Sequence, residues 1–168
     1  MRSEPSARQP HSLPQWLSSP AGAHLLVWEQ SHCDRVLTDV FGYHALQVGL
    51  PQLHALRGNR MPKQWVVADV WPELSTSQTI ALYADSVALP FPAASLDLIV
   101  LPHTLDLCAD PHAALREVER VLVPEGRVLV FGFNPVSLWG LGHALGRRLP
   151  EAADLIAHWR LHDWLRLL

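Results

Sequence analysis

Four residues in this sequence, Gly49, Asp69, Asp85 and His103, each follow directly on a short apolar run. Runs of this kind favour strands, and the carboxyl ends of parallel strands meet at the edge of an open α/β sheet where ligands bind. We therefore expect the four residues to gather around one cleft. Asp69 stands twenty residues after Gly49, where a ribose-binding acid is expected in dinucleotide-binding folds.

Metal-ligating residue types are also concentrated here, because His103, Cys108, Asp110 and His112 fall within ten residues. Zinc needs several such side chains to converge on one point. Asp110 and His112 have a simpler use at the start of a helix, so we predict no metal site. Histidine titrates near neutral pH, so His103 is a candidate general base or acceptor-positioning group. The alternative for His103 is a structural role within a loop.

The composition indicates a folded domain without a dedicated charged partner. Of the 168 residues 49% are apolar and 17% are charged, and the net charge of −3 argues against a nucleic-acid partner. Two cysteines provide no disulfide framework, which suits a reducing compartment. No stretch approaches the roughly 18 apolar residues of a membrane helix. We therefore expect a cytoplasmic protein with no nucleic-acid and no membrane partner.

The first half of the chain is expected to contain a leader, a helix and three strands. Residues 1–18 are rich in Ser, Pro and Gln, which favours a flexible leader before a single domain over residues 19–168. Ser19-Pro20 is typical of an N-cap followed by proline at the first helical position, and Phe41-Gly42 should end this helix. The sequence predicts strands at residues 44–48, 64–68 and 79–83.

The second half predicts a strand, a helix and a further strand. Residues 96–102 are almost wholly apolar, as in a strand covered on both faces, and Asp97 within them should bond neighbouring backbone. A helix with one apolar face should begin at Asp110-Pro111 and stop at Pro124-Glu125-Gly126. Residues 127–133 then form the next strand, which completes a βαβ unit.

Beyond Asn134-Pro135 the sequence favours helix, over residues 136–149 and 154–168. The predicted fold class is therefore α/β, with a Rossmann-like, mostly parallel open sheet and helices on both faces. Because no strand is predicted after residue 133, two interpretations are open: the sheet lacks its C-terminal edge strands, or the sequence is a fragment of a longer domain.

Residues 84–135 resemble class I S-adenosylmethionine-dependent methyltransferases of the type 11, ubiquinone-biosynthesis-like branch. The resemblance is carried by a strand ending in Ala-Asp, then Leu-Pro-Phe, a Leu-Asp-Leu-Ile-Val strand, and a helix ending in Arg-Val-Leu-Val-Pro-Glu-Gly before an apolar strand. It implies S-adenosyl-L-methionine as cofactor and a small, apolar or aromatic acceptor. It also implies that the Asp85 carboxylate accepts from the adenine amine while the Ser86 amide faces a ring nitrogen. The expected cofactor-binding set is Gln47, Gly49, Asp69, Asp85, Ser86 and His103.

The first strand departs from the family pattern of an acid followed by a run of glycines. Here the stretch is Gln47-Val48-Gly49-Leu50-Pro51, in which only the first glycine remains and Gln47 replaces the acid. Glycines let the backbone approach the ligand, and a glutamine cannot form an ion pair with the ammonium group of the methionine moiety. Two hypotheses follow: an active methyltransferase, or a catalytically degenerate binding module. A module lacking edge strands could pair its sheet edge as a homodimer.

Overall fold

The computed structural model describes residues 13–69, 78–133 and 158–167. Its strands form one parallel sheet in the order β3-β2-β1-β4-β5. The strands are β1 (His44–Val48), β2 (Lys63–Ala68), β3 (Leu82–Tyr83), β4 (Leu96–Pro102) and β5 (Leu122–Phe131). Among the described helices, none is long and apolar enough to cross a membrane.

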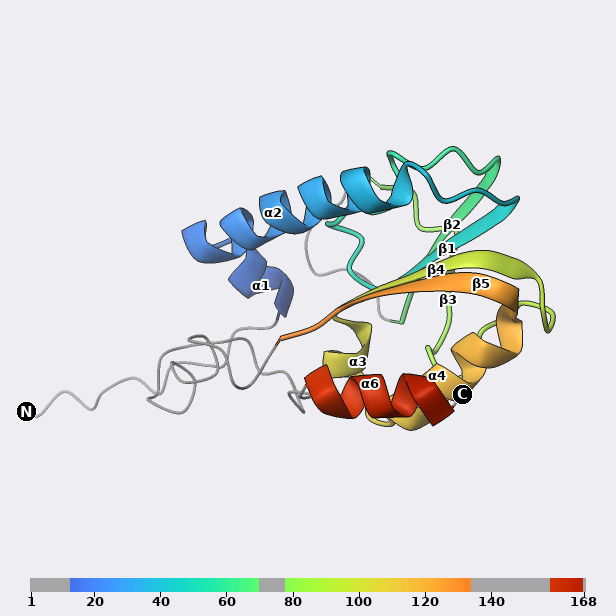
Figure 1. Ribbon diagram of the computed structural model, residues 1–168. Helices are drawn as coiled ribbons and strands as arrows, with labels where there is room; N and C mark the ends of the chain where they lie inside the picture. Colours follow the sequence, from blue (N-terminus) through green and yellow to red (C-terminus); the bar gives the residue numbers. More distant parts are fainter. Residues whose placement is uncertain (1–12, 70–77, 134–157, 168) are drawn as a thin grey trace, which may run out of the picture.

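Helices cover both faces of this sheet, as Figure 1 shows. The helices are α1 (Leu13–Leu17), α2 (Pro20–Leu37), α3 (Thr104–Leu107), α4 (Pro111–Val121) and α6 (His158–Leu167). α1 and α2 lie on one face, α4 and α6 on the other, and α3 follows the carboxyl end of β4 (Figure 1). The predicted α/β, Rossmann-like class is confirmed.

The two core layers follow from the alternation of side chains along each strand. Ala45, Leu98 and Val100 belong to the cluster packed with α1 and α2. Their neighbours Leu46 and Ile99 belong to the cluster packed with α4. Both faces of β1 and β4 are therefore buried, which explains the uninterrupted apolar run in β4 that the sequence showed.

No helix joins β1 to β2, because residues 49–62 form turns. Parallel strands need a crossover of a dozen or more residues, usually a helix. Here the connection buries Leu50, Leu53, Ala55 and Leu56 in the same cluster as α1 and α2. The connection therefore fills the place where a crossover helix would pack.

Two predictions about the N-terminal part need correction. The Ser19 side chain accepts from the Gly22 amide as the predicted N-cap, but α2 ends at Leu37 rather than at Phe41-Gly42. The predicted leader is wrong for Leu13–Leu17, which form α1. Buried side chains in α1, among them Trp16, explain the difference, since they pack into the core.

The helix-to-strand boundary near residue 122 also differs from the prediction. α4 ends at Val121 and β5 starts at Leu122, so the Pro124-Glu125-Gly126 stretch lies inside the strand. It forms a bulge, since pairing jumps from Leu122 to Arg127 opposite β4 while Glu125 has a positive φ of 65°. Proline has no N–H for the ladder, which makes such a bulge the natural place for it.

The remaining boundaries are closer to expectation. β3 is confined to Leu82–Tyr83, shorter than the predicted 79–83, as suits a strand at a sheet edge. Of the helical prediction over residues 154–168, His158–Leu167 are confirmed as α6. The predicted helix over residues 136–149 lies outside the described residues, and β5 is the sheet edge within the described ranges.

The predicted backbone role of Asp97 is confirmed, and it yields a stability test. Its Oδ2 accepts from the amides of Tyr43 and His44, both at 2.9 Å, which joins the start of β4 to the start of β1. We expect Asp97→Ala to lower the free energy of unfolding by about 2–3 kcal/mol, because two bonds to a charged acceptor are lost. Chemical denaturation measures this. Asp97→Asn keeps an acceptor oxygen and should cost less than half as much; an equal cost would contradict the assignment.

Candidate functional site

A cleft lies at the carboxyl ends of β1 and β4, next to the carboxyl end of β2. The chain runs from β1 outward to β2 and β3 and then returns to β4 on the other side of β1. In open α/β sheets this reversal of strand order is where ligands bind. The cleft is lined by Val48, Gly49, Leu50, Asp69, Ser86, Pro102, Thr104, Leu107 and Cys108.

Three of the predicted residues line this cleft together: Gly49, Asp69 and Ser86. Gly49 has a φ of +81°, and a Cβ at this position would lie 3.2 Å from Thr104 Oγ1. Both facts favour glycine here. The Asp69 side chain is exposed, whereas Ser86 is buried and its hydroxyl donates to Cys108 Sγ at 3.4 Å. The structure thus brings the Gly49 backbone, an exposed carboxylate and a hydroxyl to one cleft.

Asp85 does not line the cleft but immediately precedes Ser86, which does. Its Oδ1 accepts from the Val87 amide at 3.0 Å, so the carboxylate shapes the turn after β3. The Asp85 side chain is exposed, and its second oxygen has no hydrogen bond within the described part of the chain. The carboxylate can therefore hold the turn and still accept from a ligand.

Gln47 occupies a different position from the one predicted. Its side chain is fully buried and bonds only to the loop that follows β1. Its Nε2 donates to the carbonyl oxygens of Gly49, Leu50 and Leu53, and its Oε1 accepts from the Ala55 amide at 3.1 Å. The amide is thus used entirely in holding this loop, and it does not face the cleft.

His103 is likewise buried, with 1% exposure, and it does not line the cleft, so the expectation that it lies there with Gly49 and Asp69 is wrong. Its backbone is left-handed, with a φ of 56° at the start of α3, and its ring turns toward α2. Nδ1 lies 3.1 Å from Asp106 Oδ2, and Nε2 lies 2.8 Å from Glu29 Oε1. The ring also stacks on Phe133 with 4.3 Å between centroids. Because both ring nitrogens are occupied, this geometry argues against a general base.

The two carboxylates also control the charge of His103. Burial disfavours the charged imidazole, but the hydrogen bonds that it donates to Asp106 and Glu29, together with their negative charges, outweigh burial and raise the pKa of His103 to about 9. His103 therefore carries its proton at neutral pH. A protonated imidazole cannot accept a proton from an acceptor substrate.

Several residues of this region were missed at the level of sequence. Glu29 and Asp106 hold His103, and Thr104 Oγ1 donates to the Val48 carbonyl. One available signal was the spacing of Glu29 with Cys33 and Leu37, which places a carboxylate on the buried stripe of α2. Cys108, which directly follows α3, also lines the cleft, and no sequence pattern indicated that position.

Asp110 and His112 both lie at the start of a helix, α4, as predicted. Asp110 caps α4 by accepting from the Ala113 amide at 2.9 Å, and the His112 ring lies 3.8 Å from that of Trp164. Within the described ranges, no three His, Cys, Asp or Glu side chains are grouped as a metal ion would need.

The chain is similar in sequence to one family of protein domains and to two known proteins. Residues 52–130 match the Methyltransferase domain family. The uncharacterized protein YafS of Escherichia coli is 33% identical over 134 residues, which cover 78% of this chain and 54% of YafS. The ubiquinone/menaquinone biosynthesis C-methyltransferase UbiE of Edwardsiella ictaluri is 35% identical over 79 residues, or 45% of this chain and 32% of UbiE. The match thus spans about half of YafS and a third of UbiE.

Solved structures show the same fold at low sequence identity. A SAM-dependent methyltransferase of Thermotoga maritima has a TM-score of 0.68 at 15% identity, covering 92% of this chain and 78% of that one. A chain from the Haloferax volcanii complex of the Trm112 methyltransferase activator with a methyltransferase has a TM-score of 0.65 at 17% identity. That match covers 95% of this chain and 76% of the other.

The raised pKa of His103 predicts how stability depends on pH. Below about pH 6.5 the imidazole is protonated in both the folded and the unfolded chain, so its contribution is fully present. Between pH 6.5 and the folded pKa of about 9 only the unfolded chain releases the proton, and stability falls with rising pH. We expect the free energy of unfolding to fall by roughly 3 kcal/mol over this pH range, and denaturation at several pH values measures it. In His103→Gln this decrease in stability with rising pH should be absent. Parallel pH profiles of stability in the variant and the natural sequence would contradict the assignment.

Proposed function

We propose that this chain, which belongs by sequence and fold with the class I S-adenosylmethionine-dependent methyltransferases, transfers a methyl group from that cofactor to a small molecule. The observation that carries the proposal is the cleft at the point of strand reversal between β1 and β4. Gly49, Asp69 and Ser86, three residues of the cofactor-binding set that the sequence predicts, line it together. Asp85 stands beside it.

The residues present fit the adenosine part of the cofactor. Asp69 offers an exposed carboxylate after β2, which would accept from the ribose hydroxyls. Asp85 would accept from the adenine amine, and the Ser86 backbone amide would face an adenine ring nitrogen. Gly49 has no side chain to keep a ligand away from its backbone, and a Cβ there would lie 3.2 Å from Thr104 Oγ1.

The chemistry requires little from the protein beyond positioning. S-adenosylmethionine supplies an electrophilic methyl group on a positively charged sulfur. Holding an acceptor in line with that methyl group in a site shielded from water supplies most of the acceleration. Leu50, Pro102 and Leu107 give the cleft an apolar wall suited to excluding water and to holding an apolar or aromatic acceptor.

The described residues at the cleft include few groups that could remove a proton from an acceptor, and this restricts the kind of acceptor. Among the described residues that line it, Asp69 is the only carboxylate, and the Cys108 sulfur accepts from Ser86. His103 is held in the charged form by two buried carboxylates. We therefore favour an acceptor atom that is already nucleophilic, so that no strong base is needed. The relation to a C-methyltransferase of quinone biosynthesis supports an electron-rich ring as one such acceptor.

Binding of the demethylated product provides the direct test. S-adenosylhomocysteine should bind the folded chain in calorimetry, and Asp69→Ala should weaken binding about tenfold, because hydrogen bonds to a charged group are lost. Glu119→Ala is the matched control, since Glu119 is an exposed carboxylate on α4 outside the cleft, and it should bind like the natural sequence. No detectable binding at millimolar ligand by a protein shown to be folded would reject the function.

A further inference from the structure

The loop that joins β3 to β4 carries Asp85 and Ser86, and its residues 84–95 form turns rather than a helix or a strand. Ser86 lines the cleft. The Ala88 amide donates to the Asp85 carbonyl and the Val87 amide donates to Asp85 Oδ1, both at 3.0 Å, which closes a turn around Ser86. Loops move more than the elements they connect. The position of this turn therefore depends on contacts from outside it.

Leu89, three residues after Ser86, is the point where this loop is fastened to α4. The Leu89 amide donates to Glu117 Oε1 at 2.8 Å, and the Leu89 carbonyl accepts from the Arg120 guanidinium at 3.0 Å. One carboxylate and one guanidinium thus engage both backbone polar groups of the same residue. Leu89 is also buried, in the cluster packed with α4. It cannot shift without breaking bonds to two charged side chains, which are stronger than bonds between neutral groups.

Glu117 and Arg120 are joined to each other by a bidentate ion pair. Arg120 Nε donates to Glu117 Oε2 at 2.8 Å, and Nη2 donates to Oε1 at 2.6 Å. The hydrogen bonds from Arg120 lower the pKa of the Glu117 carboxyl against the opposing effect of burial, so the carboxylate is charged at neutral pH. Partly exposed pairs contribute little to folding. The specific consequence of this pair is that an acceptor and a donor are held ready for Leu89.

A second contact joins the same loop to the residue after α3. The Ser86 hydroxyl donates to Cys108 Sγ at 3.4 Å. Sulfur is a weak acceptor, so this bond alone holds the loop less firmly than the bonds at Leu89 do. The turn at Asp85 and Ser86 is therefore held on the elements that follow β4, and the stronger attachment is the one to α4.

We propose that Glu117 and Arg120 are positioning residues for the adenine of the cofactor. By fixing Leu89, they set where the Ser86 amide and the Asp85 carboxylate stand against the ring. This inference rests on the proposed function and extends it to two residues of α4 that do not line the cleft. Discrimination by hydrogen bonds requires donors and acceptors at fixed positions. Loss of the pair should therefore reduce the selectivity for adenine as well as the affinity.

Two ligands that differ only in the base measure this selectivity. S-adenosylhomocysteine has an amino group and an unprotonated ring nitrogen where S-inosylhomocysteine has a carbonyl oxygen and an N–H. In calorimetry, the natural sequence should bind the adenine ligand about tenfold or more tightly than the inosine ligand. In Glu117→Ala this ratio should fall to about threefold or less, because the Leu89 amide loses its acceptor and Arg120 loses its ion-pair partner.

Asp97→Ala is the matched control. It also removes a carboxylate that accepts from backbone amides, but at the start of β1, away from this loop. A smaller folded fraction weakens both ligands by the same factor, so the ratio in Asp97→Ala should equal that of the natural sequence. Arg120→Ala is a second variant in case Glu117→Ala fails to fold, since the Arg120 side chain is 42% exposed. It should lower the ratio as well.

An unchanged ratio in whichever variant folds would overturn the inference and leave the ion pair a structural contact of α4. An equal fall of the ratio in Asp97→Ala would overturn it too, because the effect would then come from lower stability. If the natural sequence binds neither ligand, the proposed function itself fails. If it binds both equally well, the placement of adenine at Asp85 and Ser86 fails, and this inference fails with it.

Discussion

The protonated imidazole of His103 connects three separate parts of the chain at the carboxyl end of the sheet. It bonds Glu29 on α2 and Asp106 in α3, and its ring stacks on Phe133 just beyond β5. Asp106 in turn accepts from the Phe133 amide at 3.0 Å. Because the same residue begins α3, whose side chains line the cleft, the shape of the cleft depends on this buried cluster. A charged group with both nitrogens engaged suits this positioning role better than catalysis.

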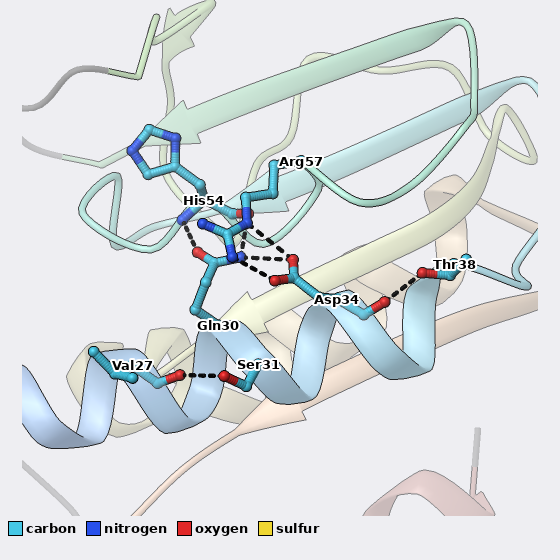
Figure 2. Close-up of polar contacts among 7 residues, drawn as sticks. All are labelled: Val27, Gln30, Ser31, Asp34, Thr38, His54 and Arg57. Atoms are coloured by element: carbon cyan, nitrogen blue, oxygen red, sulfur yellow. Dashed lines mark hydrogen bonds and ion pairs between the residues drawn. The ribbon is translucent and has the colours of Figure 1, made fainter.

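The conformation of the loop after β1 depends on the Gln47 amide. Methyltransferases of this class place glycines in that loop, which lets its backbone lie against the ligand. Here Leu50, Leu53 and Leu56 fill the loop with apolar side chains, and Gln47 bonds its carbonyls from within. The loop is therefore a packed part of the core, further fixed to α2 by Gln30 (Figure 2). The loss of glycines from this loop and the hydrogen bonds that Gln47 makes within it therefore have the same effect, which is to hold the loop as part of the core.

Much of this fold could be predicted because its signals are local. β1 and β4 have the predicted bounds, since a strand covered on both faces needs an unbroken apolar run. The boundary between α4 and β5 could not be placed, because a bulge at Glu125 lets the strand begin before the proline that seemed to end the helix. β3 is shorter than its apolar run, since only part of that run pairs with β2.

The site was predicted in position but not in side-chain direction. Strand ends identify Gly49 and Asp69 from the chain alone, because the topology brings such ends together, and the family resemblance adds Ser86. Whether His103 points into the cleft or toward α2 depends on its left-handed backbone and on Glu29, 74 residues away, and no spacing rule carries that information. Gln47 is similar, since its partners lie in a loop whose conformation the sequence does not specify.

A crystal structure of the chain grown with S-adenosylhomocysteine would test the central claim most directly, namely that the cleft between β1 and β4 binds this cofactor. The expected result is ligand density beside Gly49, Asp69 and Ser86. Density for the ligand at another place on the molecule, with the cleft filled only by water, would contradict the claim.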